Sequence, residues 1–306
     1  MHATRGFEES EELIPEVFLR DLRFAARGAE HAEVERLLRV CESSCGKGAF
    51  LAEALSWAAR AYFKKGHLQH AALRAQETYT LAASLVDGGE TLESVAGVEN
   101  PLATALGAAI EVTAQLAVAE GRSADAIAHL QEMEERYRGL PIHTRIRKNL
   151  LQLTLQGQPA PALDMTPLPK TEQGEFVLGN GRILLFFWAH WCSDSRTQSR
   201  TLGLILAKPE FADIRLIAPT RRFGYVSKGT AAEEAEEITH IREVLSVDYP
   251  LLREKVPIPY GTGNFETYGA STFPTLVLID HEGVVRLYHP GVMKLDALEA
   301  ALGAAA

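Results

Sequence analysis

A cluster of prolines near the middle of the chain divides this sequence into two parts with different patterns. Gly157-Gln158-Pro159-Ala160-Pro161 is followed by Pro167 and Pro169. Because proline lacks an amide donor and restricts the residue before it, a helix cannot continue through this stretch. We therefore expect an extended connector that separates a domain at 1–156 from a domain at 157–306.

The first part has the pattern of helices throughout. It is rich in Ala, Leu, Glu and Arg, and its apolar residues are spaced three and four apart. Leu13 to Val40 predicts one or two helices, and the serines and glycines between Cys41 and Gly48 indicate a break. We expect a separate all-α domain.

Small and aromatic residues recur at matching offsets in two predicted helix pairs, Phe50–Val86 and Leu102–Tyr137. They are Ala59, Tyr62, Gly66, Ala71 and Ala75 in the first pair, and Ile110, Ala114, Ala117, Gly121, Ala126 and Leu130 in the second. These offsets resemble a degenerate tetratricopeptide repeat, in which stacked helix pairs present an interaction face for a protein partner. Close helix packing without a true repeat, and a dimerisation or spacer role, remain alternatives.

After the connector, strand patterns alternate with helix patterns. Glu175–Leu178 and Ile183–Trp188, joined by Gly179-Asn180-Gly181, predict a hairpin whose second strand is fully buried. The elements expected next are a helix at 193–207, a strand at 214–218, an acidic helix at 230–246, strands at 276–279 and 284–288, and a helix at 294–302. This order predicts an α/β domain in which helices flank a mixed central sheet.

Composition excludes several classes of function. With 31 Lys and Arg against 40 Asp and Glu, the net charge of -9 argues against nucleic-acid binding. Apolar runs such as Ile183–Trp188 are far shorter than the ~20 residues of a membrane span, so we expect none. The three cysteines form neither a disulfide framework nor a four-ligand zinc site, so we expect no metal and no cofactor.

Cys192 is the main candidate for chemistry. It lies at a predicted strand-to-helix junction, where unsatisfied backbone amides and the helix dipole favour the thiolate form. Arg196 adds to this effect, whereas Asp194 opposes it by repulsion. A thiolate at such a position is a nucleophile.

Four segments resemble thioredoxin-superfamily proteins, specifically the TlpA/ResA-type thiol-disulfide oxidoreductases. In chain order they are 157–161, Phe187-Trp188-Ala189-His190-Trp191-Cys192, Tyr268-Gly269 through Phe273-Pro274-Thr275, and Leu278–Gly283. The resemblance implies a thioredoxin-like fold and a cis-proline, Pro274, against Cys192. It also implies that extended protein or peptide disulfide clients pair with the backbone at Phe273, with Trp191 flanking the groove.

Ser195 departs from the family pattern, because it stands where the resolving cysteine of a C-x-x-C pair would be. Serine cannot break a mixed disulfide, although its hydroxyl can donate a hydrogen bond to the Cys192 thiolate. We expect monothiol exchange that is resolved by an external thiol or redox partner such as glutathione, or by a second client cysteine. The alternatives are a non-catalytic client-binding or scaffold protein, and a trapping substitution of an original cysteine.

The other cysteines, Cys41 and Cys45, lie four residues apart and could form a local disulfide where the backbone is irregular. One of them could instead resolve Cys192 if the helical domain folded back. His190 is expected to be a half-exposed histidine at a strand end. The basic and aromatic residues at 221–228 and the glutamates at 233–237 are expected to form solvated surface.

The N-terminus turns acidic at once and carries no export signal. If Met1 is the native start, we expect a cytoplasmic protein. If a signal peptide was trimmed, the family resemblance implies an extracytoplasmic (periplasmic) location, where disulfides persist.

Overall fold

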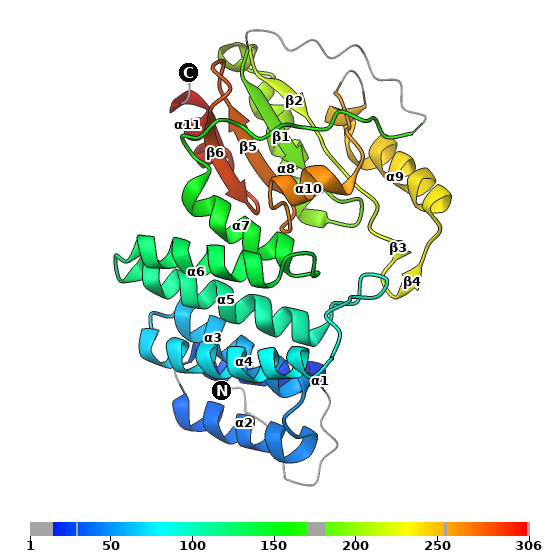
Figure 1. Ribbon diagram of the computed structural model, residues 1–306. Helices are drawn as coiled ribbons and strands as arrows, with labels where there is room; N and C mark the ends of the chain where they lie inside the picture. Colours follow the sequence, from blue (N-terminus) through cyan, green and yellow to red (C-terminus); the bar gives the residue numbers. More distant parts are fainter. Residues whose placement is uncertain (1–14, 29, 170–180, 254–255, 305–306) are drawn as a thin grey trace, which may run out of the picture. The chain divides into compact units, whose positions relative to one another are not determined.

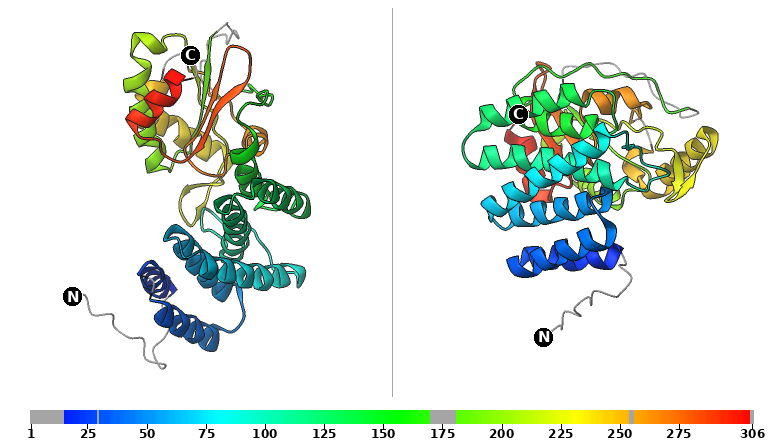
Figure 2. Two further views of the ribbon diagram at one scale, coloured as in Figure 1. Left: turned by 90° about the vertical axis from the view of Figure 1, so that its left-hand side faces the viewer. Right: turned by 60° about the horizontal axis from the view of Figure 1, so that its bottom comes forward.

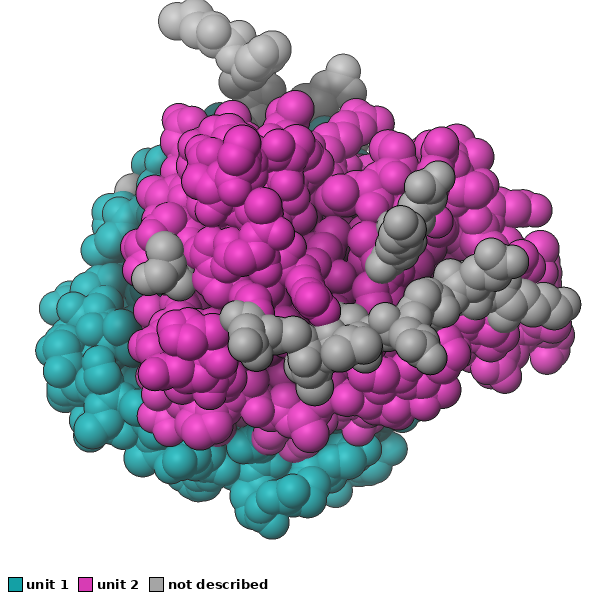
Figure 3. Space-filling view, turned by 90° about the horizontal axis from the view of Figure 1, so that it is seen from above, with its two compact units in different colours: residues 1–93, 99–142 teal, residues 94–98, 143–306 magenta. Residues whose placement is uncertain are grey.

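A computed structural model describes residues 15–28, 30–169, 181–253 and 256–304. The chain forms two compact units, one of residues 1–93 and 99–142 and one of residues 94–98 and 143–306 (Figure 3). The units therefore part before helix α7 (His143–Thr154), whereas the predicted boundary lies after it. The reason is that α7 packs against a strand and a helix of the second unit.

The described part of the first unit is helical, as predicted (Figure 1). Its helices are α1 (Pro15–Arg27), α2 (His31–Cys45), α3 (Ala49–Lys64), α4 (Leu68–Asp87), α5 (Pro101–Ala119) and α6 (Ser123–Arg136). Alanines such as Ala58, Ala59 and Ala108 are fully buried and allow α3, α4 and α5 to approach closely.

The turns after α3 and α5 have the same geometry. Gly66 and Gly121 have φ angles of 80° and 76°, which favour glycine. In each turn the following amide, that of His67 or Arg122, donates to a carbonyl five residues earlier, at 3.0 and 2.8 Å. These glycines stand at the turn positions of the predicted repeat, and the tetratricopeptide assignment itself stays a prediction.

The break expected between Cys41 and Gly48 falls at the glycine end of that segment, because α2 continues to Cys45, Gly46 is its C-cap residue and α3 begins at Ala49. Cys41 is fully buried in the core of the helical unit, so tertiary packing extends the helix through its serines. Among the described residues, the helix α5 is long and apolar enough to cross a membrane, which was not expected from the short apolar runs of the sequence. Two-thirds of its apolar window (67%) is buried inside the protein, as in the core helix of a globular domain.

The second unit contains a mixed four-stranded sheet in the order β2-β1-β5-β6. Its strands are β1 (Ile183–Phe187), β2 (Arg215–Ile217), β5 (Thr275–Ile279) and β6 (Val285–Pro290). The strand β1 runs parallel to β2 and antiparallel to β5, with Leu184 opposite Leu216 and Leu185 opposite Val277.

Helices cover both faces of this sheet (Figure 2). Leu184 and Phe186 of β1 pack with α8 (Ser193–Leu206) and α11 (Leu295–Ala304), and α9 (Glu234–Asp248) adds to the same core. Leu185 and Phe187 point to the other face, where α7 and α10 (Thr262–Thr267) pack. The predicted α/β domain, in which helices flank a mixed central sheet, is confirmed.

The predicted start of the acidic helix differs from the structure, and one predicted strand lies outside the described residues. A hairpin of β3 (Tyr225–Ser227) and β4 (Thr230–Ala231) precedes α9, which begins at Glu234 rather than at residue 230. The strand predicted at 175–178 lies outside the described residues. Short 3-10 helices, Pro209–Phe211 and Pro250–Leu252, follow α8 and α9.

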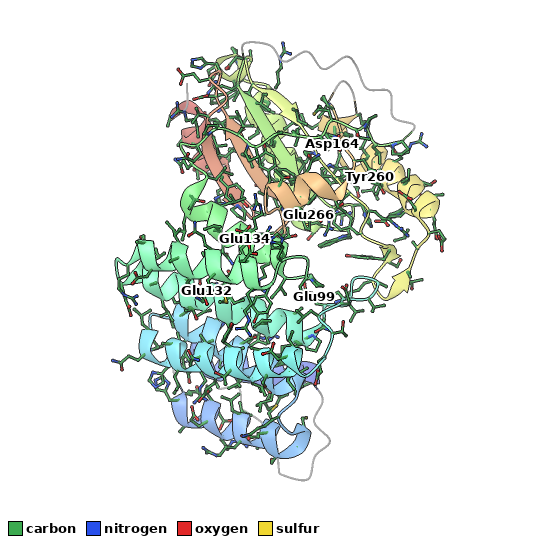
Figure 4. All side chains as sticks on the ribbon, in the orientation of Figure 1. Glu99, Glu132, Glu134, Asp164, Tyr260 and Glu266 are labelled. Atoms are coloured by element: carbon green, nitrogen blue, oxygen red, sulfur yellow. The ribbon has the colours of Figure 1, made fainter. Side chains whose placement is uncertain are left out.

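The connector runs without regular structure along the second unit. Asp164, on this connector, is labelled in Figure 4. Its backbone exchanges two hydrogen bonds with the Asn264 side-chain amide, at 2.8 and 2.7 Å. Isolated bridges join Pro159 to Val284 and Pro167 to Pro259. The connector is therefore fixed to the domain that it introduces.

Residues 94–98, from the loop between α4 and α5, also belong to the second unit. They form a tight turn in which Ala96 and Gly97 both have positive φ angles, 47° and 78°. The Ala96 carbonyl accepts from the Gly229 amide at 2.7 Å. The ring of Tyr225 lies so close to Gly97 that a Cβ atom there would be 2.6 Å from it.

Candidate functional site

Cys192 is the N-cap residue of α8, just after β1. Its Sγ atom accepts a hydrogen bond from the Ser195 amide at 3.4 Å and donates one to the Phe273 carbonyl oxygen at 3.5 Å. The residue is 8% exposed. The sulfur thus lies at the N-terminal end of α8, where it caps the first turn.

Ser195 is fully buried one turn further along α8. Its backbone amide contacts the sulfur, but the predicted hydrogen bond from its hydroxyl to Cys192 is not formed in the structure. Tyr249, also fully buried, donates to the Ala189 carbonyl oxygen at 3.4 Å and packs its ring against Trp188. Burial raises the pKa of Tyr249, so its phenol stays protonated at neutral pH.

Arg196 forms an ion pair with Asp248. Its guanidinium lies 2.9 Å from the Asp248 carboxylate, and both side chains are about one-third exposed (32% and 31%). A paired, partly solvated arginine exerts little field on its surroundings. We therefore attribute the environment of Cys192 mainly to the backbone amides of α8.

The groove residues predicted beside Cys192 lie together. The Phe273–Pro274 peptide bond is cis. The indole of Trp191, 42% exposed, meets the ring of Phe273 edge to face at 5.7 Å between centroids. With the hydrogen bond from Cys192 to the Phe273 carbonyl, these contacts place Phe273 next to Cys192 and the Trp191 ring next to that of Phe273.

His190 is not half-exposed as expected. It is 1% exposed, its Nδ1 atom lies 4.0 Å from the Glu237 carboxylate, and its ring meets that of His240 edge to face. Burial lowers the pKa of His190 to about 4, and repulsion by His240 acts in the same direction. The imidazole is therefore neutral at pH 7.

Glu237 was missed by the interpretation of its helix as solvated surface. It is fully buried, and its two carboxylate oxygens accept hydrogen bonds from the Phe223 amide at 2.6 Å and the Gly224 amide at 2.8 Å. Arg222 Nε lies 3.8 Å away. Glu237 holds the loop that precedes β3 against α9.

The described residues contain no group of three or more His, Cys, Asp or Glu side chains that could hold a metal ion. Cys41 and Cys45 are free thiols on consecutive turns of α2, without the irregular backbone that a local disulfide would need. Burial raises the pKa of the Cys41 thiol to about 12, which makes it a poor nucleophile, whereas Cys45 is exposed.

No family model matches the chain. The thioredoxin-like protein YneN of Bacillus subtilis is 25% identical over 145 residues, which are 47% of this chain and 76% of that protein. Two similar solved structures are the exposed lipoprotein thioredoxin Etrx1 of Streptococcus pneumoniae and a secreted disulfide oxidoreductase of Mycobacterium tuberculosis. Etrx1 is 27% identical with a TM-score of 0.32 and covers 41% of this chain and 85% of its own. The second is 18% identical with a TM-score of 0.31 and covers 42% and 84%.

Proposed function

We propose that the second unit catalyses thiol-disulfide exchange on protein or peptide clients through Cys192 alone. The observation that carries this proposal is the position of Cys192. It caps the first turn of α8 beside the cis-proline, with Ser195 in the resolving position. The second unit contains no other cysteine, so the resolving thiol comes from elsewhere.

The reaction begins when the Cys192 thiolate attacks one sulfur of a client disulfide. A new bond joins Cys192 to the client, the old sulfur–sulfur bond breaks, and the other client sulfur leaves as a thiolate that takes up a proton. If a client thiol then attacks the mixed disulfide, Cys192 is released and the client is isomerised without net oxidation. If glutathione attacks the client sulfur instead, Cys192 is released and the client retains one thiol and one glutathione disulfide.

Extended clients suit the surface beside Cys192, because the backbone at Phe273 can pair with an added strand and Trp191 is an exposed flanking side chain. The helical unit supplies a surface for a further protein partner. An extracytoplasmic location suits this function, since disulfides persist there.

The test measures reduction of a peptide disulfide with and without glutathione, in a Cys45→Ser background that removes the exposed thiol. We expect glutathione-dependent turnover that is lost in Cys192→Ser. We expect Ser195→Cys to release the mixed disulfide without glutathione, because a thiol one turn away can attack it. Turnover that survives in Cys192→Ser would contradict the proposal.

The low exposure of Cys192, 8%, favours a second candidate, a non-catalytic client-binding protein. That function predicts no turnover by any variant and no alkylation of Cys192 at neutral pH, while peptides still bind. A trapping substitution predicts stable mixed disulfides with clients, and full reductase activity in Ser195→Cys.

A further inference from the structure

An aromatic wall of Trp191, Phe223 and Phe273 stands beside Cys192. The ring of Phe223 meets Trp191 edge to face at 5.8 Å and Phe273 at 5.5 Å between centroids. Trp191 and Phe273 belong to the segments that carry the family resemblance, whereas Phe223 comes from the loop before β3. All three side chains keep some exposure to solvent.

The loop that carries Phe223 is held by a buried carboxylate rather than by regular structure. Glu237 accepts the amides of Phe223 and Gly224, and Gly224 has a φ angle of 82° that favours glycine. Charge-assisted hydrogen bonds to a buried acceptor are strong and directional. Because one of them is made by the Phe223 amide, Glu237 fixes the point from which the Phe223 ring projects.

The Arg221 guanidinium lies against the wall, where it stacks over Phe223 at 5.1 Å and over Phe265 at 5.3 Å. The Glu237 carboxylate faces the loop, because both of its oxygens accept hydrogen bonds from backbone amides there. A cationic side chain at the wall would meet the Arg221 guanidinium, whose charge interacts with the carboxylates of Glu266 and Glu237. An apolar side chain would meet aromatic rings instead.

We propose that Glu237 is a positioning residue that sets Phe223 in the wall, and that the wall selects clients with a large apolar residue next to the reactive cysteine. This inference rests on the proposed function. A covalent bond to Cys192, which contacts the Phe273 carbonyl, brings the residues flanking the client cysteine to the wall. The occupant is thus an aromatic or long aliphatic side chain of the client, and a lysine there is disfavoured.

The experiment uses peptides of the form Gly-Xaa-Cys-Gly-Gly whose cysteine carries a thionitrobenzoate group in a mixed disulfide. Attack by the Cys192 thiolate on the peptide sulfur forms the protein–peptide disulfide and releases coloured thionitrobenzoate. Single-turnover rates are measured for Xaa = Phe, Ser and Lys in the Cys45→Ser background, with Cys192→Ser as the blank. The variants are Phe223→Ala, Phe223→Leu, Glu237→Gln and, as matched control, Glu236→Gln on the same helix but exposed to solvent.

We expect the Phe peptide to react about tenfold faster than the Ser peptide at subsaturating concentration, and the Lys peptide to be slowest. Phe223→Ala and Glu237→Gln should abolish the preference for Phe over Ser by raising the half-saturating concentration of the Phe peptide alone. Phe223→Leu should restore part of the preference, and Glu236→Gln should keep all of it.

A full preference for Phe in Phe223→Ala would overturn the subsite. An equal loss with all three peptides in Glu237→Gln would reduce Glu237 to a structural role. Neither result touches the proposed function, which fails separately if Cys192 releases thionitrobenzoate from no peptide and from no small aromatic disulfide.

Discussion

The buried His190 side chain makes the stability of the second unit depend on pH. Burial lowers the pKa of His190 from 6.5 to about 4 in the folded protein, whereas in the unfolded chain it returns to 6.5. The folded state favours the neutral ring. The contribution of His190 to the free energy of unfolding is therefore fully present above pH 6.5. It is lost as the pH falls through the interval from 6.5 to 4.

The magnitude follows from the two pKa values. At about 1.4 kcal/mol for each tenfold difference in proton affinity, lowering the pH from 7 to 4 removes about 3 kcal/mol of unfolding free energy. The ring is fully shielded from water and meets His240 and Glu237 at close range, so solvent screening does not reduce this value much.

The assay is urea unfolding at pH 7, 5.5 and 4, followed by tryptophan fluorescence in a Trp57→Phe background. The two remaining tryptophans, Trp188 and Trp191, both lie in the second unit. Between pH 7 and 4, the unfolding free energy of His190→Asn should fall by about 3 kcal/mol less than that of the parent. The variant His281→Asn, at an exposed position, should behave like the parent. Equal pH dependence in His190→Asn and the parent would refute the assignment to His190.

Three further substitutions test the packing of the second unit, two by urea unfolding and one by tryptophan emission. Arg182→Met removes a buried guanidinium that binds both oxygens of Asp213, at 2.7 and 2.8 Å, and should cost about 2 kcal/mol; an unchanged midpoint would contradict this. Gly97→Val drives a Cβ atom into the Tyr225 ring and should shift the emission of Trp191, on which Tyr225 stacks. Gly269→Ala, at a φ angle of 58°, places a Cβ atom 2.6 Å from the Lys148 backbone nitrogen and should cost about 2 kcal/mol, while Gly263→Ala in open space should be neutral.

The sequence is sufficient to place Cys192, because the signals there are local. A continuous apolar strand ends just before the cysteine, and a helix pattern begins just after it, so β1 and α8 flank it as expected. The cis-proline and the groove residues follow from the family resemblance, whose segments are short and contiguous. The helix pairs of the first unit are likewise visible from their spacing.

The contacts of the segment at 221–231 join residues that are far apart in the sequence, and this is why they were missed. Glu237 lies among exposed glutamates, yet Glu237, Ile241 and Leu245 recur every four residues and are all buried on one face of α9. That spacing is the signal that separates Glu237 from its neighbours. His190 was judged from strand alternation, but α9 and the loop before β3 cover the strand end, and no pattern near residue 190 indicates them.

The turn at 94–98 makes the second unit discontinuous along the chain. Its Ala96 carbonyl and Gly97 backbone complete the packing around β3 and Tyr225, although the helices on either side belong to the first unit. A fragment that begins at the proline connector therefore lacks residues 94–98 and 143–156 of the domain that it is meant to contain. Neither domain can therefore be replaced by itself in a chimeric protein, because the α4–α5 loop has to be kept together with the second unit that it completes.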